Sequence, residues 1–186
     1  MKIDQILNEI YPLPVVTIAE ISKHIKEVRF DKGHILLRAD RVEKNLYFLK
    51  KGVVRAFATQ EAEDITFWFG KEGETVLSMK SYVDNQKSYE SIELLENCEL
   101  YEMNIEQLRA LFNTDIHIAN WGRKLAEKEL IKLEKRIISR ELQSAKQRYD
   151  ELLSTQPSLL QRVQLKYIAS YLGITPVSLS RIRKEK

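Results

Sequence analysis

The last 22 residues of the chain, Leu165 to Lys186, contain two short helical patterns separated by a glycine. Apolar residues recur at the i, i+3, i+4 and i+7 positions of the first pattern, namely Leu165, Ile168, Ala169 and Leu172. Gly173 can adopt the positive φ that ends a helix. Thr175 and Pro176 then suit the N-cap and the first position of a second helix. The segment is therefore expected to fold as two short helices joined by a tight turn.

The expected second helix has one apolar face and one polar, basic face. Leu179 and Ile182 point inward, and the outward positions are held by Ser178, Arg181 and Lys184. Ala169 is small at the place where two steeply crossed helices would touch. These features predict a helix-turn-helix whose second helix reads DNA. An ordinary helical hairpin is the alternative, but such a hairpin would not need the glycine, the Thr-Pro cap and the basic face together.

The segment resembles the helix-turn-helix of bacterial transcription regulators. That pattern requires a small residue, then a glycine four positions later, with aliphatic residues at set places around them. Ala169 and Gly173 hold the two special positions. The aliphatic positions are held by Ile168, Leu172, Ile174, Leu179 and Ile182. The resemblance implies a DNA-binding module at this end of the chain.

Charge is distributed unevenly along the 186 residues, a length that allows one large domain or two small ones. Residues 143–186 contain eight Lys or Arg and three Asp or Glu, a balance of +5, whereas the whole chain carries +3. The first 142 residues are therefore mildly acidic. A basic C-terminal segment favours a polyanionic partner for that segment alone, although a solvated helical face would look similar.

Cys98 is the only cysteine, which excludes an intramolecular disulfide and any four-cysteine metal or cluster site within one chain. This composition suits a reducing cytosol. No apolar run approaches the roughly 18 residues of a membrane span, and the N-terminus lacks a signal-peptide core. We expect a cytoplasmic protein with no membrane partner and no metal site.

From Val28 to Met103 the chain alternates apolar and polar residues at period two. The alternating groups are Ile35/Leu37, Leu46/Phe48, Val54/Ala56/Ala58 and Ile65/Phe67/Phe69. Glycines stand between them at turn positions. Many short antiparallel strands of this kind imply a sandwich or a rolled barrel. Residues 3–26 before them suit a short helical lead-in broken by two prolines.

Residues 117–142 form a long helical pattern without proline. A 4-3-4 spacing, typical of a coiled-coil seam, relates Ala126, Leu130, Leu133 and Ile137. A second apolar line, which could face the protein's own sheet, consists of Ile131, Ile138 and Leu142. Intramolecular packing on both sides is one interpretation. We prefer homodimerisation along the seam, because helix-turn-helix proteins usually pair to span two half-sites.

The order of a strand-rich roll, a long helix and a helix-turn-helix resembles the Crp/Fnr, or catabolite-activator, family across nearly the whole chain. The N-terminal resemblance rests on residues 30–57, where Leu46-Tyr47-Phe48-Leu49 followed by Gly52 matches the family's strand and turn. It implies an α+β fold. The expected parts are a cyclic-nucleotide-binding-like antiparallel β-roll sensor over 1–115, a dimerisation helix over 116–142 and a DNA-binding domain over 143–186.

The expected phosphate cassette departs from the family pattern. Ligand-binding members hold a cyclic nucleotide with a Gly-Glu pair at the ribose and an Arg-Ser pair at the phosphate. Counted from Gly73, those positions fall on four residues without charge, Leu77, Ser78, Ser88 and Tyr89. Cyclic AMP is therefore not expected to bind, and no cofactor is expected. The four residues remain candidates for the pocket of another small-molecule effector.

The expected recognition helix also departs from the best-known members, which carry arginine and glutamate where Pro176 and Val177 stand. Arg181 matches the family's later arginine, which can donate two hydrogen bonds to guanine. The candidate DNA-contacting residues are Thr175, Val177, Ser178, Arg181 and Lys184. Because the sequence ends at Lys186, directly after this helix, the wing hairpin of longer members is expected to be missing.

These observations predict a dimeric, sequence-specific transcription regulator that binds a pseudo-palindromic operator in double-stranded DNA, with RNA polymerase as a candidate protein partner. The alternative is an effector- or partner-binding module whose helix-turn-helix no longer reads DNA. An enzyme on a cupin-like roll is not expected. His34 is the only histidine between Val28 and Met103, and no nucleophile–base spacing suggests a catalytic residue.

Overall fold

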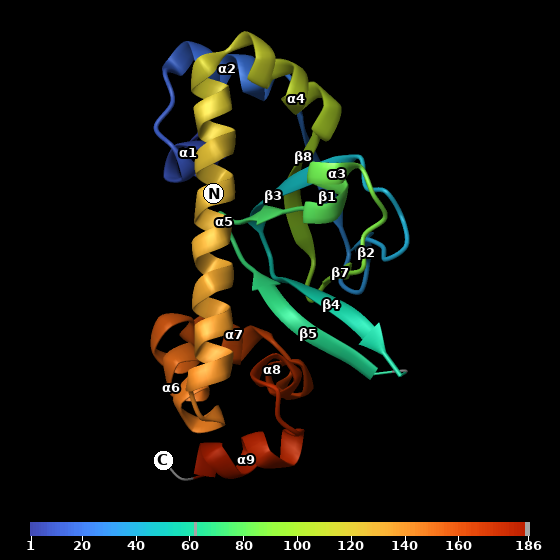
Figure 1. The fold of residues 1–186 in the computed structure, drawn as a ribbon, viewed down its shortest axis with the longest axis vertical. Coiled ribbons are helices and arrows are strands. Elements are labelled where there is room, and N and C mark those ends of the chain that lie inside the picture. Colours follow the sequence, from blue (N-terminus) through green and yellow to red (C-terminus); the bar gives the residue numbers. More distant parts are fainter. Residues whose placement is uncertain (62, 185–186) are drawn as a thin grey trace. The chain divides into compact units, whose positions relative to one another are not determined.

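The computed structural model describes residues 1–61 and 63–184 (Figure 1). Two compact units account for the chain. The first comprises Met1–Ala56 and Phe69–Glu129, and the second comprises Phe57–Trp68 and the chain from Leu130 onward. These units differ from the three segments expected from the sequence, because the long helix is shared between them and residues 57–68 group with the C-terminal helices.

The first unit begins with two short helices, α1 (Ile3–Ile10) and α2 (Val15–Ser22). Pro12 and Pro14 lie between them, which confirms the expected broken helical lead-in. Ile6 and Leu7 of α1 and Ile21 of α2 are buried, so the lead-in is part of the core.

Eight antiparallel strands follow, as the period-two pattern predicts, and they form two four-stranded sheets. The first sheet has the order β1 (Ile25–Phe30), β8 (Cys98–Asn104), β3 (Asn45–Lys51) and β6 (Thr75–Val76). The second has the order β2 (Ile35–Leu37), β7 (Ser91–Leu94), β4 (Val54–Gln60) and β5 (Glu63–Gly70). In the first sheet β8 is central, and its Met103 lies opposite both Ile25 and Leu46.

Helix α3 (Met79–Asp84) lies between β6 and β7 in the sequence, α4 (Ile105–Thr114) follows β8, and α5 (Ile116–Leu142) begins one residue later. Most of β4 and β5 belongs to the second unit, whereas helices α3 and α4 and the first half of α5 belong to the first. Asn104 caps α4 with its side-chain oxygen, which accepts from the amides of Glu106 and Gln107. Asp115 separates α4 from α5 and accepts from the amide of His117 at 2.7 Å.

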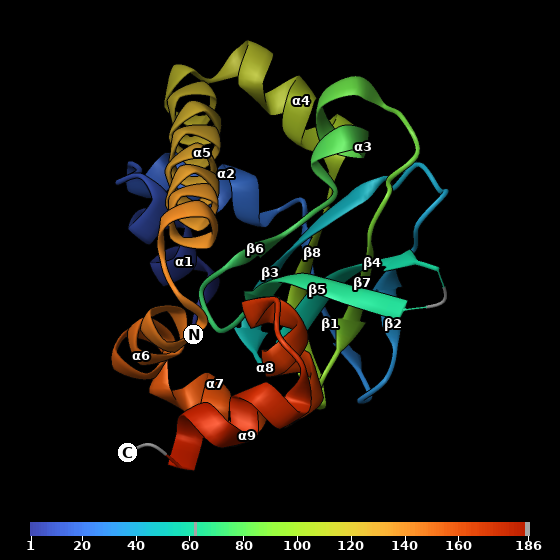
Figure 2. The same cartoon turned by 60° about the horizontal axis from the view of Figure 1, so that its bottom comes forward.

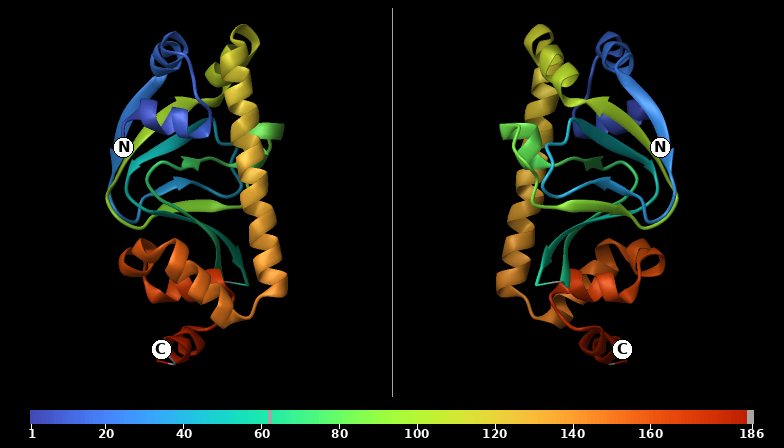
Figure 3. Two further views of the ribbon diagram at one scale, coloured as in Figure 1. Left: turned by 90° about the vertical axis from the view of Figure 1, so that its left-hand side faces the viewer. Right: turned by 90° about the vertical axis from the view of Figure 1, so that its right-hand side faces the viewer.

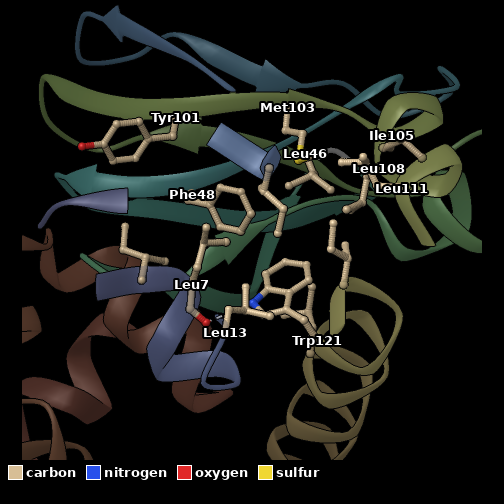
Figure 4. Packing of buried hydrophobic residues seen from close by; sticks show 14 residues of the cluster. Leu7, Leu13, Leu46, Phe48, Tyr101, Met103, Ile105, Leu108, Leu111 and Trp121 are labelled. Atoms are coloured by element: carbon tan, nitrogen blue, oxygen red, sulfur yellow. Dashed lines mark hydrogen bonds between the residues drawn. The ribbon is translucent and has the colours of Figure 1, made fainter. Parts of the chain in front are cut away.

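The core of the first unit gathers around Trp121 of α5, whose side chain is 1% exposed. Its ring lies edge-on to the ring of Phe48 of β3, with 5.9 Å between the ring centroids. Its Nε1 donates a hydrogen bond to the carbonyl oxygen of Leu7 at 3.0 Å (Figure 4). The indole therefore joins α1, β3 and α5 while its only donor is satisfied. Figure 4 shows Leu108 and Leu111 of α4 and Met103 of β8 in the same cluster.

Helix α5 is one uninterrupted helix of 27 residues, seen from two sides in Figure 3. Its buried residues all lie in the first ten positions: Ile118, Trp121, Gly122 and Leu125. From Ala126 to Leu142 no residue of α5 is buried. The helix therefore starts as a core element and continues with no fully buried side chain.

The second unit contains four short helices after α5: α6 (Ala145–Thr155), α7 (Pro157–Arg162), α8 (Leu165–Leu172) and α9 (Pro176–Lys184) (Figure 2). A capping box of Ser144 and Gln147 starts α6. Pro157 stands at the first turn of α7, where its missing amide costs nothing. Over the described ranges, no helix is long and apolar enough to cross a membrane.

Candidate nucleic-acid interface

Helices α8 and α9 have the predicted two-helix arrangement. Ile168, Ala169 and Leu172 of α8 are buried, as is Leu179 of α9, whereas Leu165 at the start of the stripe is 38% exposed. Gly173 adopts φ +68° as the C-cap of α8. The amide of Ile174 donates to the Ala169 carbonyl at 3.0 Å, which closes the turn. The local fold of the predicted helix-turn-helix is therefore present.

Thr175 caps α9 as its position predicts. Its hydroxyl oxygen accepts from the amide of Ser178 at 3.1 Å, and the two hydroxyl oxygens lie 3.0 Å apart. The Thr175 hydroxyl is thus engaged in starting the helix. The Ser178 hydroxyl, one turn into α9, shares this contact and is half-buried.

The outer face of α9 is exposed and basic. Thr175, Arg181 and Lys184 are exposed, Val177 is 62% exposed, and Ser178 is half-buried. Arg183 in the last turn is also exposed, which the sequence analysis did not single out. The charge count of this segment contained that signal, because three cations occur within four residues. The structure therefore places four of the five predicted contact residues on α9 and the fifth, Thr175, at its N-cap.

A further exposed cation lies at the start of α8. Lys166 is exposed, and its Nζ lies 4.7 Å from the centroid of the Tyr167 ring. Gln164 at the N-cap makes no side-chain capping bond. In helix-turn-helix proteins the first helix crosses the DNA backbone, so this end can meet a phosphate. The sequence-based prediction did not include Lys166, because it took DNA contacts only from the second helix and its N-cap.

The predicted coiled-coil seam is exposed along α5. Leu130 is 65% exposed, Leu133 56% and Ile137 54%, and Ala126 is exposed as well. Ile116, which is 69% exposed, stands two heptads before Leu130 and therefore occupies the same seam position. Arg123 holds the equivalent position between them, so the continuous apolar seam begins at Ala126.

The second apolar line of α5, which could face the protein's own sheet, is half or more exposed. Ile131 and Ile138 are each 50% exposed and Leu142 is 79% exposed. Apolar periodicity identifies a line of side chains but not its partner, because a neighbouring sheet and a second chain select the same residue types.

The four candidate effector residues have different surroundings. Ser78 is fully buried, and its hydroxyl caps α3 by accepting from the amide of Ser81 at 3.4 Å. The buried Ser88 hydroxyl lies 2.9 Å from the Arg38 carbonyl oxygen, to which it donates. Leu77 packs against the core cluster, whereas Tyr89 is 63% exposed. Both serine hydroxyls are therefore engaged by the protein's own backbone.

The cassette helix α3 is held at several points. Ser81 accepts from the amide of Glu43 at 3.1 Å and donates to the Gln86 carbonyl at 2.9 Å. The guanidinium of Arg109 on α4 donates to the Tyr82 carbonyl near the end of α3. These bonds fasten α3 to the β2–β3 connection and to α4.

A buried charge pair of the roll was not predicted from the sequence. Arg55 of β4 is 3% exposed, and its Nε donates to Glu93 of β7 at 2.7 Å. Period-two alternation assigns Arg55 to a polar face, because Val54 and Ala56 flank it. Only the pairing of β4 with β7 shows that this arginine is buried beside a carboxylate. In the described ranges no group of three or more His, Cys, Asp or Glu residues could hold a metal.

Comparisons with known proteins agree with this geometry. Residues 27–115 match the cyclic nucleotide-binding domain. A structure from Eubacterium rectale assigned to the Crp/Fnr family of transcriptional regulators has a TM-score of 0.74 and 18% identity, over 95% of this chain and 87% of that chain. FixK2 from Bradyrhizobium japonicum has a TM-score of 0.73 and 15% identity, over 87% of this chain and 83% of that one.

The global regulator CLP of Xanthomonas campestris, described as responsive to c-di-GMP, has a TM-score of 0.68 and 19% identity, over 92% of this chain and 91% of that one. No curated protein matches the sequence. These likenesses confirm the α+β roll, long helix and C-terminal helical region expected from the sequence. Residues 27–115 are similar to the cyclic nucleotide-binding domain, and the chain has the fold seen in structures of Crp/Fnr regulators.

Proposed function

We propose that this chain is a dimeric transcription regulator of the Crp/Fnr type that binds DNA sequence-specifically in the cytoplasm and catalyses no reaction. The observation that carries the proposal is α9, a capped helix whose exposed face presents Val177, Arg181 and Lys184, and which follows the glycine turn after the buried Ala169 and Leu172. RNA polymerase is a candidate protein partner.

In the proposed complex the two α9 helices of a dimer enter successive major grooves about 34 Å apart, so the operator is a pseudo-palindrome. Arg181 donates two hydrogen bonds to a guanine, and Val177 touches a thymine methyl group. Phosphate groups are contacted by Lys184, Arg183 and Lys166. These contacts position the helix-turn-helix on the DNA without specifying the base sequence. Pro176 supplies no side-chain donor, so base specificity rests mainly on Arg181 and Ser178.

The exposed seam of α5 supports the dimer. Leu130, Leu133 and Ile137 each expose more than half of their side chains, although such residues are normally buried. Two helices paired through these positions would remove the side chains from water and place one recognition helix on each side of a two-fold axis.

Cyclic AMP is not the effector in this proposal. Neither a carboxylate nor a guanidinium stands at the ribose and phosphate positions, and the hydroxyls of Ser78 and Ser88 are engaged by the backbone. An effector of the roll would therefore be a small molecule that does not need those anchors. Its binding would compete with the hydrogen bonds that hold α3.

Selection of the full-length protein against random duplexes tests the proposal. We expect enrichment of a palindrome, and affinity that falls with salt in proportion to the phosphates contacted. Arg181→Ala should cost about 1–3 kcal/mol of binding free energy and relax discrimination at one base pair in each half-site. Lys146→Ala, which removes an exposed cation of α6, is the matched control and should leave base preference unchanged.

Failure to enrich any palindrome, with and without a metabolite extract, would overturn the proposal. That result would favour the second candidate function, a roll that binds an effector or partner while its helix-turn-helix no longer reads DNA. The unusual first turn of α9, with Pro176 and Val177, is the observation behind this alternative.

A further inference from the structure

The last three residues of α8 are each bonded to a different element of the second unit. The hydroxyl of Ser170 accepts from the amide of Thr66 at 2.9 Å and donates to the Asp64 carbonyl at 3.1 Å. Arg136 of α5 donates to the carbonyl of Tyr171. Arg148 of α6 donates to the carbonyl of Leu172. We call Ser170, Tyr171 and Leu172 the α8 junction.

The contact at Ser170 comes from the β4–β5 hairpin. Thr66 on β5 is 1% exposed, so its bond to the serine hydroxyl is shielded from water. The same hydroxyl also donates to the hairpin backbone at Asp64. A single side chain therefore fastens the hairpin to α8 at two backbone groups.

The contact at Tyr171 comes from α5. The guanidinium carbon of Arg136 lies 3.7 Å from the centroid of the Tyr171 ring, and the same guanidinium donates to the Tyr171 carbonyl. Burial lowers the pKa of Arg136, although an arginine stays charged at neutral pH. This planar contact uses stacking and hydrogen bonding together, a combination that lysine cannot reproduce.

The contact at Leu172 also links α8 to the end of α5. Arg148 donates to the Leu172 carbonyl through Nε at 3.2 Å and Nη2 at 2.8 Å. Its Nη1 donates to the carbonyl of Gln143, the residue that follows α5. One guanidinium thus ties the C-terminal ends of two helices together, where its positive charge also meets both helix dipoles favourably.

Only three residues separate the α8 junction from the recognition helix α9. Pro176 begins α9 four residues after Leu172, and Leu179 anchors α9 with a fully buried side chain. A change at the α8 junction would therefore change the direction of α9 relative to the C-terminal part of α5. Because α5 carries the proposed dimer seam, that direction sets the separation of the two α9 helices in a dimer.

We propose that Arg136, Arg148 and Ser170 are positioning residues that hold α9 at one angle to α5 and thereby set the half-site spacing of the operator, without touching DNA. This inference rests on the proposed function. It assigns base preference to the α9 face and spacing preference to the α8 junction, so the two properties should be separable by mutation.

Spacing preference is the measurement that distinguishes positioning from general stabilisation. The half-site selected by the wild-type protein is placed in palindromes with the selected spacer and with spacers changed by one or two base pairs. Arg136→Met, Arg136→Lys and Ser170→Ala are compared with Lys135→Met, which removes the exposed neighbouring cation of α5. Far-ultraviolet circular dichroism and sedimentation establish that each variant is folded and dimeric.

We expect the wild-type protein and Lys135→Met to prefer one spacer at least tenfold. Arg136→Met should reduce that preference to within about threefold, Arg136→Lys should restore little of it, and Ser170→Ala should give an intermediate loss. The base preference within each half-site should stay as in the wild type. An equal loss of affinity for all spacers, or an unchanged spacer preference in folded variants, would overturn the inference.

A second readout needs no operator. A spin label at Lys184→Cys on each α9 reports the separation of the two helices, and the native Cys98 is 2% exposed. We expect a narrow distance distribution in the wild-type background and a broad one with Arg136→Met; equal widths would refute the positioning role. If the wild type forms this narrow distribution and Arg136→Met broadens it but no palindrome is selected, the proposed DNA-reading function fails, and with it the half-site spacing; only the role of Arg136 in holding α9 at one angle to α5 stands.

Discussion

The two halves of α5 have opposite surroundings although they form one continuous helix. Ile118, Trp121 and Leu125 in the first half are buried in the core of the first unit. Leu130, Leu133 and Ile137 in the second half each expose more than half of their side chains. The apolar residue types are alike, but in the first half they meet neighbours of the same chain.

This difference shows that one helix can serve both stability and assembly. Side chains of the first half contribute to folding of the monomer, because their burial is complete without a partner. Side chains of the second half can contribute only when a second surface covers them. Substitutions in the first half should therefore change the free energy of unfolding, and those in the second half should change self-association.

The largest expected effect is a loss of folding stability caused by a substitution in the first half of α5. Trp121→Ala should lower the free energy of unfolding by about 3–5 kcal/mol, because it removes a fully buried ring and leaves the Leu7 carbonyl without its donor. Urea unfolding at a concentration that keeps the chain monomeric measures the change. Leu133→Ala is the control from the exposed half and should stay within about 0.5 kcal/mol under the same conditions. A similar loss in both variants would contradict the division of α5.

The next effect is in the second half and concerns association. Leu133→Ala should weaken the dimer by about 2–3 kcal/mol, since the change removes a seam contact in both protomers. Sedimentation velocity over a concentration series measures the dissociation constant. Leu142→Ala, from the second apolar line, is the matched comparison and should have little effect. A comparable loss for Leu142→Ala would show that the interface also includes the second line.

A smaller effect is expected at Gly122, where α5 approaches α4. A Cβ atom at this position would stand 2.5 Å from Cζ of Phe112, so Gly122→Ala should destabilise the chain by about 1–3 kcal/mol. Helix propensity alone predicts the opposite sign. Thermal unfolding decides between the two. The reverse change in the exposed half, Ala126→Gly, should cost only the propensity difference of about 0.5–1 kcal/mol.

The smallest effect concerns a surface carboxylate between the halves. Lys124 and Arg123 lower the pKa of Glu127 through hydrogen bonds and charge. A lowered pKa in the folded state gives a stabilisation that is present above the ordinary value of 4.5 and is lost as the pH falls through the folded value. Glu127→Gln should therefore flatten the acid side of a plot of unfolding temperature against pH. An unchanged acid slope would show that the ion pairs contribute nothing measurable.

Local patterns predicted several features correctly. The C-cap at Gly173 and the N-cap at Thr175 depend on residues within a few positions, so their geometry follows from the sequence alone. The strands of the roll were visible in period-two alternation, because every second side chain enters the same core.

Contacts between distant residues were not predictable in the same way. The buried pair Arg55–Glu93 and the two-sided bond of Ser170 join residues 38 and more than 100 positions apart. Arginine and serine are common on surfaces, so their presence in a sequence does not indicate burial. The second line of α5 could face a sheet or a second chain for the same reason, since periodicity does not identify a partner.

The sequence by itself determined the element types, the turn before α9 and the residues of its outer face, because backbone propensity, capping and periodicity act over one or two helical turns. The tertiary structure alone decided where α5 leaves the core, which serine hydroxyls of the cassette are engaged and how the end of α8 is held. Those outcomes depend on which distant segments meet, and burial and hydrogen bonding are decided only there.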